Sequence, residues 1–262
     1  MRVVLQISDT HFGTEVAPVV EAVVALAARE RPDLVVVSGD ITQRARPAQF
    51  SAARAFVERL GAPFVAIPGN HDIPLIDLWT RFTRPYARHR AAFGDDLEPV
   101  HESDELLVVC VNTTRARRHK HGEVSPAQVE RVAARLARAR AAQLRIVVVH
   151  QPIAVTRDDD RVNRLRGHAL ALPRWAAAGA DVVLGGHIHL PYVIAFDSPR
   201  AIAVVQAGTA VSRRVRPGAP NSVNLLRWEP AAASCSVEQW DFDGATRAFA
   251  RARTTPLHVA RG

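Results

Sequence analysis

The sequence predicts an α/β protein in which two β-sheets pack face to face as a sandwich, with helices covering the outer sides. Two observations lead to this prediction. Up to Pro191, short β-branched runs alternate with Ala-rich segments of helical period, which is typical of strands joined by helices. Beyond Pro191, strand-like runs follow one another with Pro, Gly and Asn turns between them, which predicts antiparallel strands.

The first part of the chain follows a β-α-β-α-β order. Pro47 suits the first turn of the second helix, because the amide hydrogens of a first turn have no acceptor within the helix, so proline loses no hydrogen bond there. Gly61 follows the last apolar positions of that helix and is a candidate C-cap. The expected elements are strand 3–7, helix 17–29, strand 34–38, helix 47–60 and strand 64–67.

The middle of the chain combines a broken helical stretch with further buried strands. Residues 73–94 have a helical pattern interrupted by Pro74 and Pro85. Ser125 and Pro126 supply an N-cap and a first-turn proline for a strong helix. The expected elements are strand 106–111, helix 125–140, strand 146–149, helix 170–178 and strand 182–184.

The last part of the chain is expected to complete the second sheet with antiparallel strands. Since the chain shows no internal repeat and can form one large core, we expect residues 1–252 to be a single domain. Residues 253–262 are expected to form a loose C-terminal tail. The late strands are expected at 192–196, 202–207, 223–228 and 235–242.

The composition argues against a membrane-spanning protein and favours the cytoplasm. The longest apolar runs, such as 106–111, are far shorter than the roughly 20 residues that cross a bilayer. Residues 1–8 have the pattern of a strand rather than of a secretory leader. Cys110 and Cys235 lie in strand-like runs, as small buried side chains do, and a disulfide between them is the alternative.

The formal net charge of +8 over 262 residues is carried mainly by arginine. Such a charge attracts phosphate-bearing molecules, but basic clusters are also common as solvated faces, and both explanations stay open. The basic segments 115–121 and 157–168 are candidates for the rim of a site. Within the second of these, residues 158–160 are three aspartates, which would repel a polyanion.

Five short motifs place metal-ligand residue types where a predicted strand ends. Because residues just beyond the carboxyl ends of strands gather in one crevice of an α/β sheet, these distant segments can converge. In extended backbone, residues i and i+2 point to the same side, so the pairs Asp-x-His and His-x-His can each face one site. Glycines before three of the motifs allow close backbone approach. The motifs are Asp9-Thr10-His11, Gly39-Asp40, Gly69-Asn70-His71-Asp72, His150 and Gly185-Gly186-His187-Ile188-His189.

Each motif taken alone has an ordinary structural explanation. Asn and Asp stabilise turns through local hydrogen bonds, and a lone histidine at a strand end is more often structural than a ligand. Five such motifs at successive strand ends are hard to produce by packing needs alone. Together they indicate a metal centre.

The five motifs resemble, in the same order, the D-x-H, GD, GNH[DE], H and GH-x-H blocks of the metallophosphoesterase, or calcineurin-like, superfamily. The resemblance covers residues 9–189 and implies the two-sheet sandwich of that superfamily with a centre of two metal ions. It implies that one ion is held by Asp9, His11 and His189, that the other is held by Asn70, His150 and His187, and that Asp40 bridges both.

A dinuclear centre of this kind suits the hydrolysis of phosphodiesters. Two cations need an anionic bridge and can jointly clamp an in-line displacement at phosphorus, here by a metal-bridging hydroxide. Two divalent ions with two carboxylates and one hydroxide keep a charge of about +1, which a phosphodiester monoanion neutralises. The imidazole-rich ligand set favours transition metals, as two divalent or mixed-valence ions of Mn, Fe, Zn or Co, over Mg or Ca.

Three residues beside the implied ligands are candidates for contact with substrate. His71 matches a superfamily residue that reaches the substrate, where it can donate a proton to the leaving oxygen or stabilise the phosphoryl charge. Asn70 and Arg44 are further candidates for substrate binding. Asp72 is a candidate catalytic residue that orients His71, and its alternative role is to stabilise the turn.

The motifs look most like those of bacterial class III cyclic-nucleotide phosphodiesterases, which makes 3',5'-cyclic nucleotides candidate substrates. One departure is Gln151, since those enzymes often carry a second histidine after the residue that matches His150. The alternative function is a metal-dependent nuclease that uses the basic surface as its track. We therefore expect a small phosphodiester as partner, nucleic acid as the alternative, and no membrane partner; the oligomeric state stays open.

Overall fold

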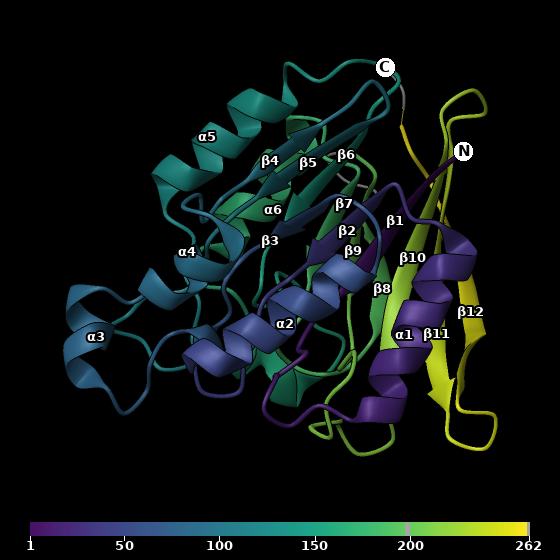
Figure 1. Ribbon diagram of the computed structural model, residues 1–262. Coiled ribbons are helices and arrows are strands. Elements are labelled where there is room, and N and C mark those ends of the chain that lie inside the picture. The colour runs from purple at the N-terminus through teal and green to yellow at the C-terminus, as the bar shows by residue number, and fades with distance from the viewer. Residues whose placement is uncertain (197–199, 261–262) are drawn as a thin grey trace.

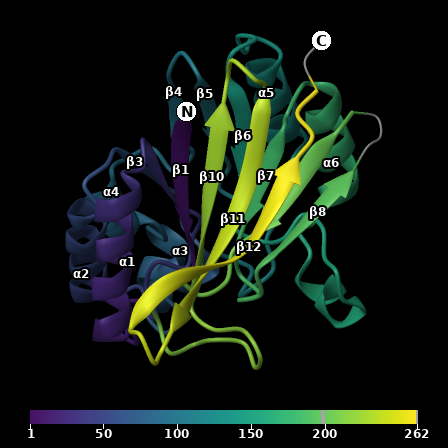
Figure 2. The same ribbon diagram turned by 90° about the vertical axis from the view of Figure 1, so that its right-hand side faces the viewer.

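The computed structural model describes residues 1–196 and 200–260. Within them, two six-stranded sheets pack face to face and helices cover their outer sides (Figures 1 and 2). Helices α1 (Ala17–Glu30) and α2 (Pro47–Arg59) lie on one side, and α5 (Pro126–Leu136) and α6 (His168–Ala177) lie on the other. The predicted two-sheet sandwich is confirmed.

The first sheet joins three parallel strands to three antiparallel ones, in the order β12-β11-β10-β1-β2-β3. In the register of its centre, Leu5 lies opposite Val35 on one side and Leu225 on the other. The strands are β1 (Arg2–Ile7), β2 (Leu34–Val37), β3 (Phe64–Ala66), β10 (Ser222–Glu229), β11 (Ser234–Asp243) and β12 (Ala248–Leu257).

The second sheet has the order β4-β5-β6-β7-β9-β8, and β5, β6, β7 and β9 run parallel. The expectation that all late strands are antiparallel is wrong for β9. The chain passes β7, forms β8 at the sheet edge and turns back, so β9 enters between them parallel to β7 and antiparallel to β8. The strands are β4 (Val100–Glu102), β5 (Leu106–Cys110), β6 (Leu144–Val148), β7 (Val182–Gly185), β8 (Tyr192–Phe196) and β9 (Ile202–Gln206).

The predicted helix signals act as expected. Pro47 begins α2, and Gly61 follows its C-cap with φ +70°, a conformation that glycine adopts without strain. Ser125 caps α5 by accepting a hydrogen bond from the amide of Gln128, although α5 ends at Leu136 rather than at residue 140. The prolines in 73–94 divide that stretch into α3 (Leu78–Thr83) and α4 (Ala87–Phe93).

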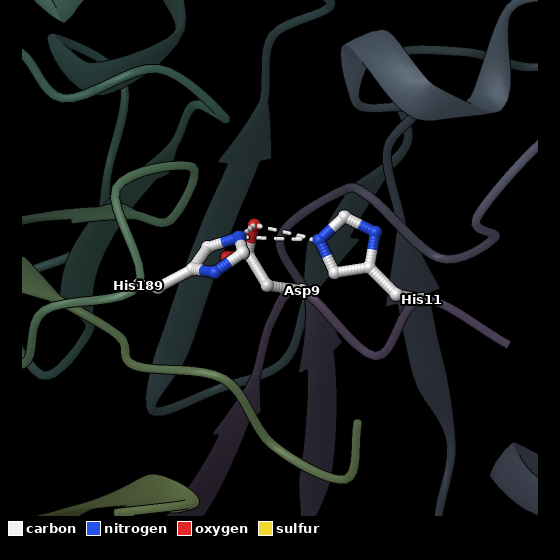
Figure 3. A group of neighbouring side chains, drawn as sticks. All are labelled: Asp9, His11 and His189. Carbon is white, nitrogen blue, oxygen red and sulfur yellow. Dashed lines mark hydrogen bonds and ion pairs between the residues drawn. The ribbon is translucent and has the colours of Figure 1, made fainter. Parts of the chain in front are cut away.

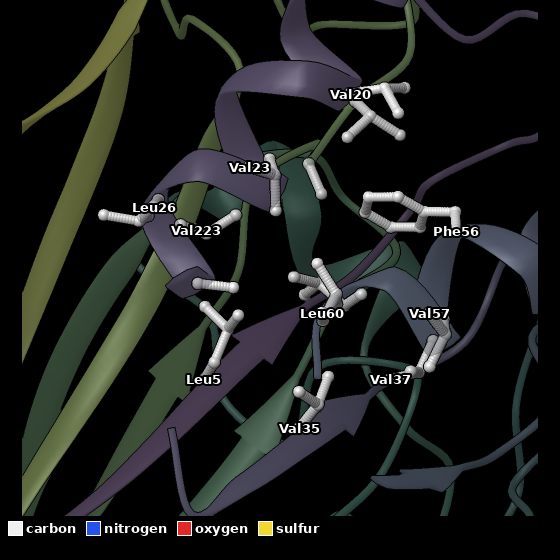
Figure 4. Close-up of a cluster of buried hydrophobic side chains, with 14 of the residues drawn as sticks. Leu5, Val20, Val23, Leu26, Val35, Val37, Phe56, Val57, Leu60 and Val223 are labelled. Carbon is white, nitrogen blue, oxygen red and sulfur yellow. The ribbon is translucent and has the colours of Figure 1, made fainter. Parts of the chain in front are cut away.

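Alternation of side chains across β1 separates two of the apolar clusters. Val4 faces the interior between the sheets, where it joins side chains such as Val148 and Leu184 of the second sheet. Leu5 and its neighbours on the opposite face pack against α1 and α2 (Figure 4). Fully burying each such side chain stabilises the fold by about 1.5–3 kcal/mol. The carboxyl ends of the parallel strands are thereby held on a rigid support.

The predicted loose tail is wrong for residues 253–257, which belong to β12 and pair with β11. Sequence patterning does not reveal β12 because most of its side chains are exposed, so apolar alternation is missing. Backbone hydrogen bonds to β11 stabilise β12 in place of side-chain burial. Residues 261–262 of the predicted tail lie outside the described residues.

Two further expectations concern cysteines and membranes. Cys110 and Cys235 are both buried, as expected of small apolar side chains, and both contribute to the cluster between the sheets. Among the described helices, none combines the length and apolar character that crossing a membrane requires.

His89 in α4 gives the fold a predictable acid sensitivity. It is fully buried beside Phe50 and Phe93, and neither ring nitrogen has a hydrogen-bond partner within residues 1–196 and 200–260. Burial, with the nearby charge of Arg90, lowers the pKa of His89 from 6.5 to about 4. As pH falls below 6.5, the unfolded chain therefore takes up this proton first, and stability present above pH 6.5 is lost toward pH 4.

We expect His89→Leu to reduce the loss of unfolding free energy between pH 7.5 and 4.5 by roughly 2–3 kcal/mol, since leucine has no proton to bind. Urea unfolding at the two pH values measures this difference. The exposed His258 provides the control, because His258→Leu should leave the loss unchanged. Equal losses in the wild-type and His89 proteins would contradict the prediction.

Candidate metal centre

The carboxyl ends of β1, β2, β3, β6 and β7 bring the predicted ligand residues to one edge of the sandwich. Two groups form in which the ligand atoms lie within 4.8 Å of one another. The first is Asp9, His11 and His189, whose rings approach the carboxylate from two sides (Figure 3). The second is Asp40, His150 and His187. The two groups contain six of the seven residues that the resemblance implies as ligands, Asn70 being the seventh, and the assignment of these residues to ions stays a prediction.

Asp40 belongs to the second group and also lies close to the first. Its Oδ1 is 3.3 Å from Nε2 of His150, and its Oδ2 is 3.9 Å from Nε2 of His11. Asp40 also forms a third close group with His11 and His71. One carboxylate therefore offers one oxygen to each side, which is the geometry that a bridging ligand requires.

The backbone at the site is left-handed at five of the seven predicted ligands. A positive φ is uncommon in residues other than glycine and costs about 1–3 kcal/mol. The expectation that Asp9 with His11, and His187 with His189, converge through extended backbone is therefore wrong; they lie in tight turns after the strands. The five residues and their φ values are Asp9 (52°), His11 (42°), Asp40 (50°), His187 (77°) and His189 (58°).

Two of the predicted glycines are required by close approach. A Cβ on Gly39, where φ is +97°, would lie 2.4 Å from Nδ1 of His150. A Cβ on Gly69 would lie 2.1 Å from the backbone nitrogen of Asp40. These glycines let three strand ends meet at van der Waals distance.

Several ligand atoms are buried without a hydrogen-bond partner in the described structure. Such atoms cost about 1–3 kcal/mol each unless something else satisfies them. A cation coordinated by oxygen and imidazole nitrogen would do so, and thus the residues present fit a metal centre. The atoms are Asp9 Oδ1, Asn70 Oδ1, His11 Nδ1, His150 Nε2 and His187 Nδ1.

The two buried carboxylates of the site keep their negative charge. Burial opposes ionisation of Asp9, but the charge of His189 outweighs it and lowers the pKa of Asp9 to about 2. Burial likewise opposes ionisation of Asp40, and His150 holds its pKa well below the usual range. Burial lowers the pKa of His11 to about 3, and burial with repulsion from His150 does the same for His187. His11 and His187 are therefore neutral, the protonation state that a metal ligand needs. In contrast, the carboxylates outweigh burial at the other two histidines, where Asp40 raises the pKa of His150 to about 9 and Asp9 raises the pKa of His189.

His71 is held at the edge of the centre by its backbone and by one ring nitrogen. Its amide donates to Asp40 Oδ1 at 2.8 Å, and its Nδ1 lies 3.0 Å from the carbonyl oxygen of Gln43. A carbonyl can only accept, so Nδ1 carries a hydrogen and Nε2 is the ring nitrogen left for a ligand in the cleft. Arg214, which lies 3.2 Å from this Nε2, was missed by sequence reasoning because no motif marks it.

Asp72 does not contact the ring of His71 in the described interactions. Its buried carboxylate accepts hydrogen bonds from the amides of Ile41, Thr42 and Gly69, and thus ties the GD turn to the GNHD turn. Burial, with repulsion from Asp40, raises the pKa of Asp72 to about 6. This geometry agrees with the turn-stabilising alternative rather than with an orienting role.

A cleft of about 610 Å³ opens over the centre. Arg44 lines it, as expected of a substrate-binding candidate, and so do His119 and Lys120 of the basic segment 115–121. The segment 157–168 contributes Asp160 and Asn163, but its arginines are not among the lining residues. Of the two basic segments, only 115–121 therefore places a basic side chain in the lining of this cleft, as far as the structure describes the chain.

A two-sheet sandwich with histidines and aspartates clustered at its strand ends, beneath a cleft with cationic side chains, is the arrangement expected of a metal-binding protein. Residues 2–191 match the model of the calcineurin-like phosphoesterase family. The chain therefore belongs to the calcineurin-like phosphoesterase family.

Similar proteins include two phosphodiesterases and a phosphatase. Over 165 residues the chain is 32% identical to a cAMP/cGMP dual specificity phosphodiesterase of Mycobacterium tuberculosis, covering 61% of this chain and 49% of that protein. It is 43% identical over 79 residues to a glycerophosphodiester phosphodiesterase of Enterobacter lignolyticus, covering 25% and 28%. These matches span less than half of either relative. The structure of a dimetal phosphatase from Danio rerio superposes with a TM-score of 0.70 at 13% identity, covering 99% of both chains.

Proposed function

We propose that this protein is a dinuclear metal-dependent hydrolase of phosphodiesters. The observation that carries the proposal is the pair of neighbouring ligand groups linked by Asp40, whose buried ligand atoms include several without a hydrogen-bond partner among the described residues. Asp9, His11 and His189 would hold one transition metal ion, and Asn70, His150 and His187 the other, with Asp40 shared. When bound, such a pair of ions neutralises phosphoryl charge and lowers the pKa of a bound water.

The protein's own residues orient the substrate and assist departure of the leaving group. His71 presents Nε2 toward the cleft, and in its imidazolium form, which carries a proton on each ring nitrogen, the Nε2 proton can pass to the leaving oxygen. Asn70 and Arg44 line the same cleft and can hold the phosphoryl oxygens and an ester arm. Asp72 supports the two turns that carry Asp40 and His71.

The proposed substrates are diesters, with 3',5'-cyclic nucleotides as one candidate. Similarity to a named cAMP/cGMP phosphodiesterase supports that candidate, while similarity to a glycerophosphodiester phosphodiesterase supports a different diester. Both relatives share the diester bond, and that common chemistry is what we propose for this chain.

We expect the metal-supplemented enzyme to hydrolyse bis-p-nitrophenyl phosphate faster than p-nitrophenyl phosphate, because the centre's estimated charge of about +1 suits a monoanion. Release of p-nitrophenolate from the two compounds under identical conditions measures the ratio. A hundredfold preference for the monoester would contradict the proposal.

A metal-dependent nuclease is the second candidate, supported by Lys120 and Arg44 in the cleft. Binding of single-stranded DNA that weakens steeply with salt would favour it, since each neutralised phosphate releases counterions. Asp160, which also lines the cleft, opposes a continuous phosphate track.

A further inference from the structure

The cleft contains cationic side chains that the proposed chemistry at the metal centre does not use. Arg214, Lys120 and Arg44 line it, and within residues 1–196 and 200–260 no carboxylate lies within ion-pair distance of any of them. Arg216 differs, because its Nη1 lies 2.9 Å from Oδ1 of the buried Asp160. Three positive charges in the cleft therefore have no counterion among the residues that the structure describes.

Arg214 is held in place by neutral groups. Its Nη1 donates to Oε1 of Gln43 at 2.9 Å and lies 3.2 Å from Nε2 of His71. Its backbone carbonyl accepts a hydrogen bond from Thr209, and its amide donates to Ser212. A guanidinium has five N–H donors, so most remain for an anion, and in the described part of the chain no carboxylate lies within ion-pair distance of Arg214.

Lys120 is brought to the cleft by a residue next to the metal centre. Gln151, which follows the ligand His150, donates from Nε2 to the carbonyl oxygen of Lys120 at 3.3 Å. Its Oε1 accepts from Thr113 at 2.6 Å and packs so closely on Gly122 that a Cβ there would lie 2.0 Å away. Gln151, at the position where the similar enzymes often carry a second histidine, thus supports the segment that carries Lys120.

The positive charge of the cleft exceeds what the scissile diester alone can neutralise. The metal centre, with its charge of about +1, already suits the single negative charge of the scissile diester. Arg214 contacts His71, the residue proposed to face the leaving group, and hence lies beside an ester arm of the substrate rather than at the ligand clusters. Further anionic charge on that arm would match the cations that remain.

We propose that Arg214 and Lys120 form a second anion subsite, which binds a phosphate or carboxylate carried on an ester arm of the substrate. This inference rests on the proposed phosphodiesterase function and narrows it to diesters with more than one negative charge. A charge-assisted hydrogen bond to such a group discriminates by about tenfold or more.

The test compares dinucleotides that share one scissile diester. The substrates are ApA, its 5'-phosphorylated form pApA and its 3'-phosphorylated form ApAp, assayed with wild type, Arg214→Ala, Lys120→Ala and Arg213→Ala. Arg213 is the matched control, because it is an exposed arginine adjacent in sequence that does not line the cleft.

We expect wild type to prefer at least one phosphorylated dinucleotide over ApA by about tenfold or more in kcat/KM. Arg214→Ala should bring that ratio close to one, Lys120→Ala should reduce it, and Arg213→Ala should preserve it. A wild-type ratio near one, or an unchanged ratio in Arg214→Ala, would overturn the subsite. Equal loss on all three substrates would do so too, since it would place Arg214 at the scissile phosphate.

A control separates this outcome from failure of the proposed function. If wild type does not hydrolyse bis-p-nitrophenyl phosphate with any of the four metals, the phosphodiesterase proposal itself is wrong. Titration calorimetry with ApA, pApA and ApAp does not depend on turnover. If the subsite exists, wild type should bind a phosphorylated dinucleotide more tightly than ApA, and Arg214→Ala should remove that difference in Kd. If the subsite does not exist, Arg214→Ala should leave the ratio of the two Kd values unchanged.

Discussion

Asp40→Asn should lose both metal ions and nearly all hydrolytic activity. The amide is similar in size to the carboxylate and can still accept the hydrogen bond from the His71 amide, so the turn is preserved. What it lacks is the negative charge shared between His11 and His150. Removing one partner from a buried charge pair costs about 3–5 kcal/mol, which is at least a hundredfold in affinity for each ion.

Elemental analysis after dialysis against limiting metal measures this loss, with thermal unfolding as a check that the variant folds. His189→Ala is the comparison, because His189 belongs to one ligand group only and should weaken one ion while the other is kept. Full occupancy by two metals in Asp40→Asn would refute the bridging role.

His71→Ala should slow hydrolysis of a cyclic nucleotide by about 10²- to 10⁴-fold, the usual contribution of a general acid. The alkoxide leaving group of such a substrate departs poorly unless it is protonated. Hydrolysis of bis-p-nitrophenyl phosphate should slow much less, because p-nitrophenolate leaves without a proton. Rates on the two substrates, measured at equal metal content, give the comparison.

The result also distinguishes the alternative roles of His71. Equal losses on both substrates with metals retained would show that His71, with Arg214 beside it, stabilises the phosphoryl charge instead. Loss of a metal would show that His71 supports the site through its contact with Asp40.

The sequence by itself determined the architecture and the composition of the candidate centre. β-branched runs such as 34–37 and helix signals such as Pro47 and Ser125 act through local backbone preferences, which a linear sequence displays. Ligand types at successive strand ends were visible because parallel strands deliver their carboxyl ends to one edge. The assignment of ions to those ligands stays a proposal.

Only the tertiary structure decided the features that depend on contacts between distant segments. β12 is stabilised by pairing with β11 despite its exposed side chains, and β9 takes its direction from strands on either side. Asp9 and His11 converge through left-handed turns whose strain the surrounding packing maintains, not through extended backbone. Arg214 reaches His71 from a position 143 residues later in the chain. No local pattern encodes that approach, because the contact exists only once the two sheets have packed.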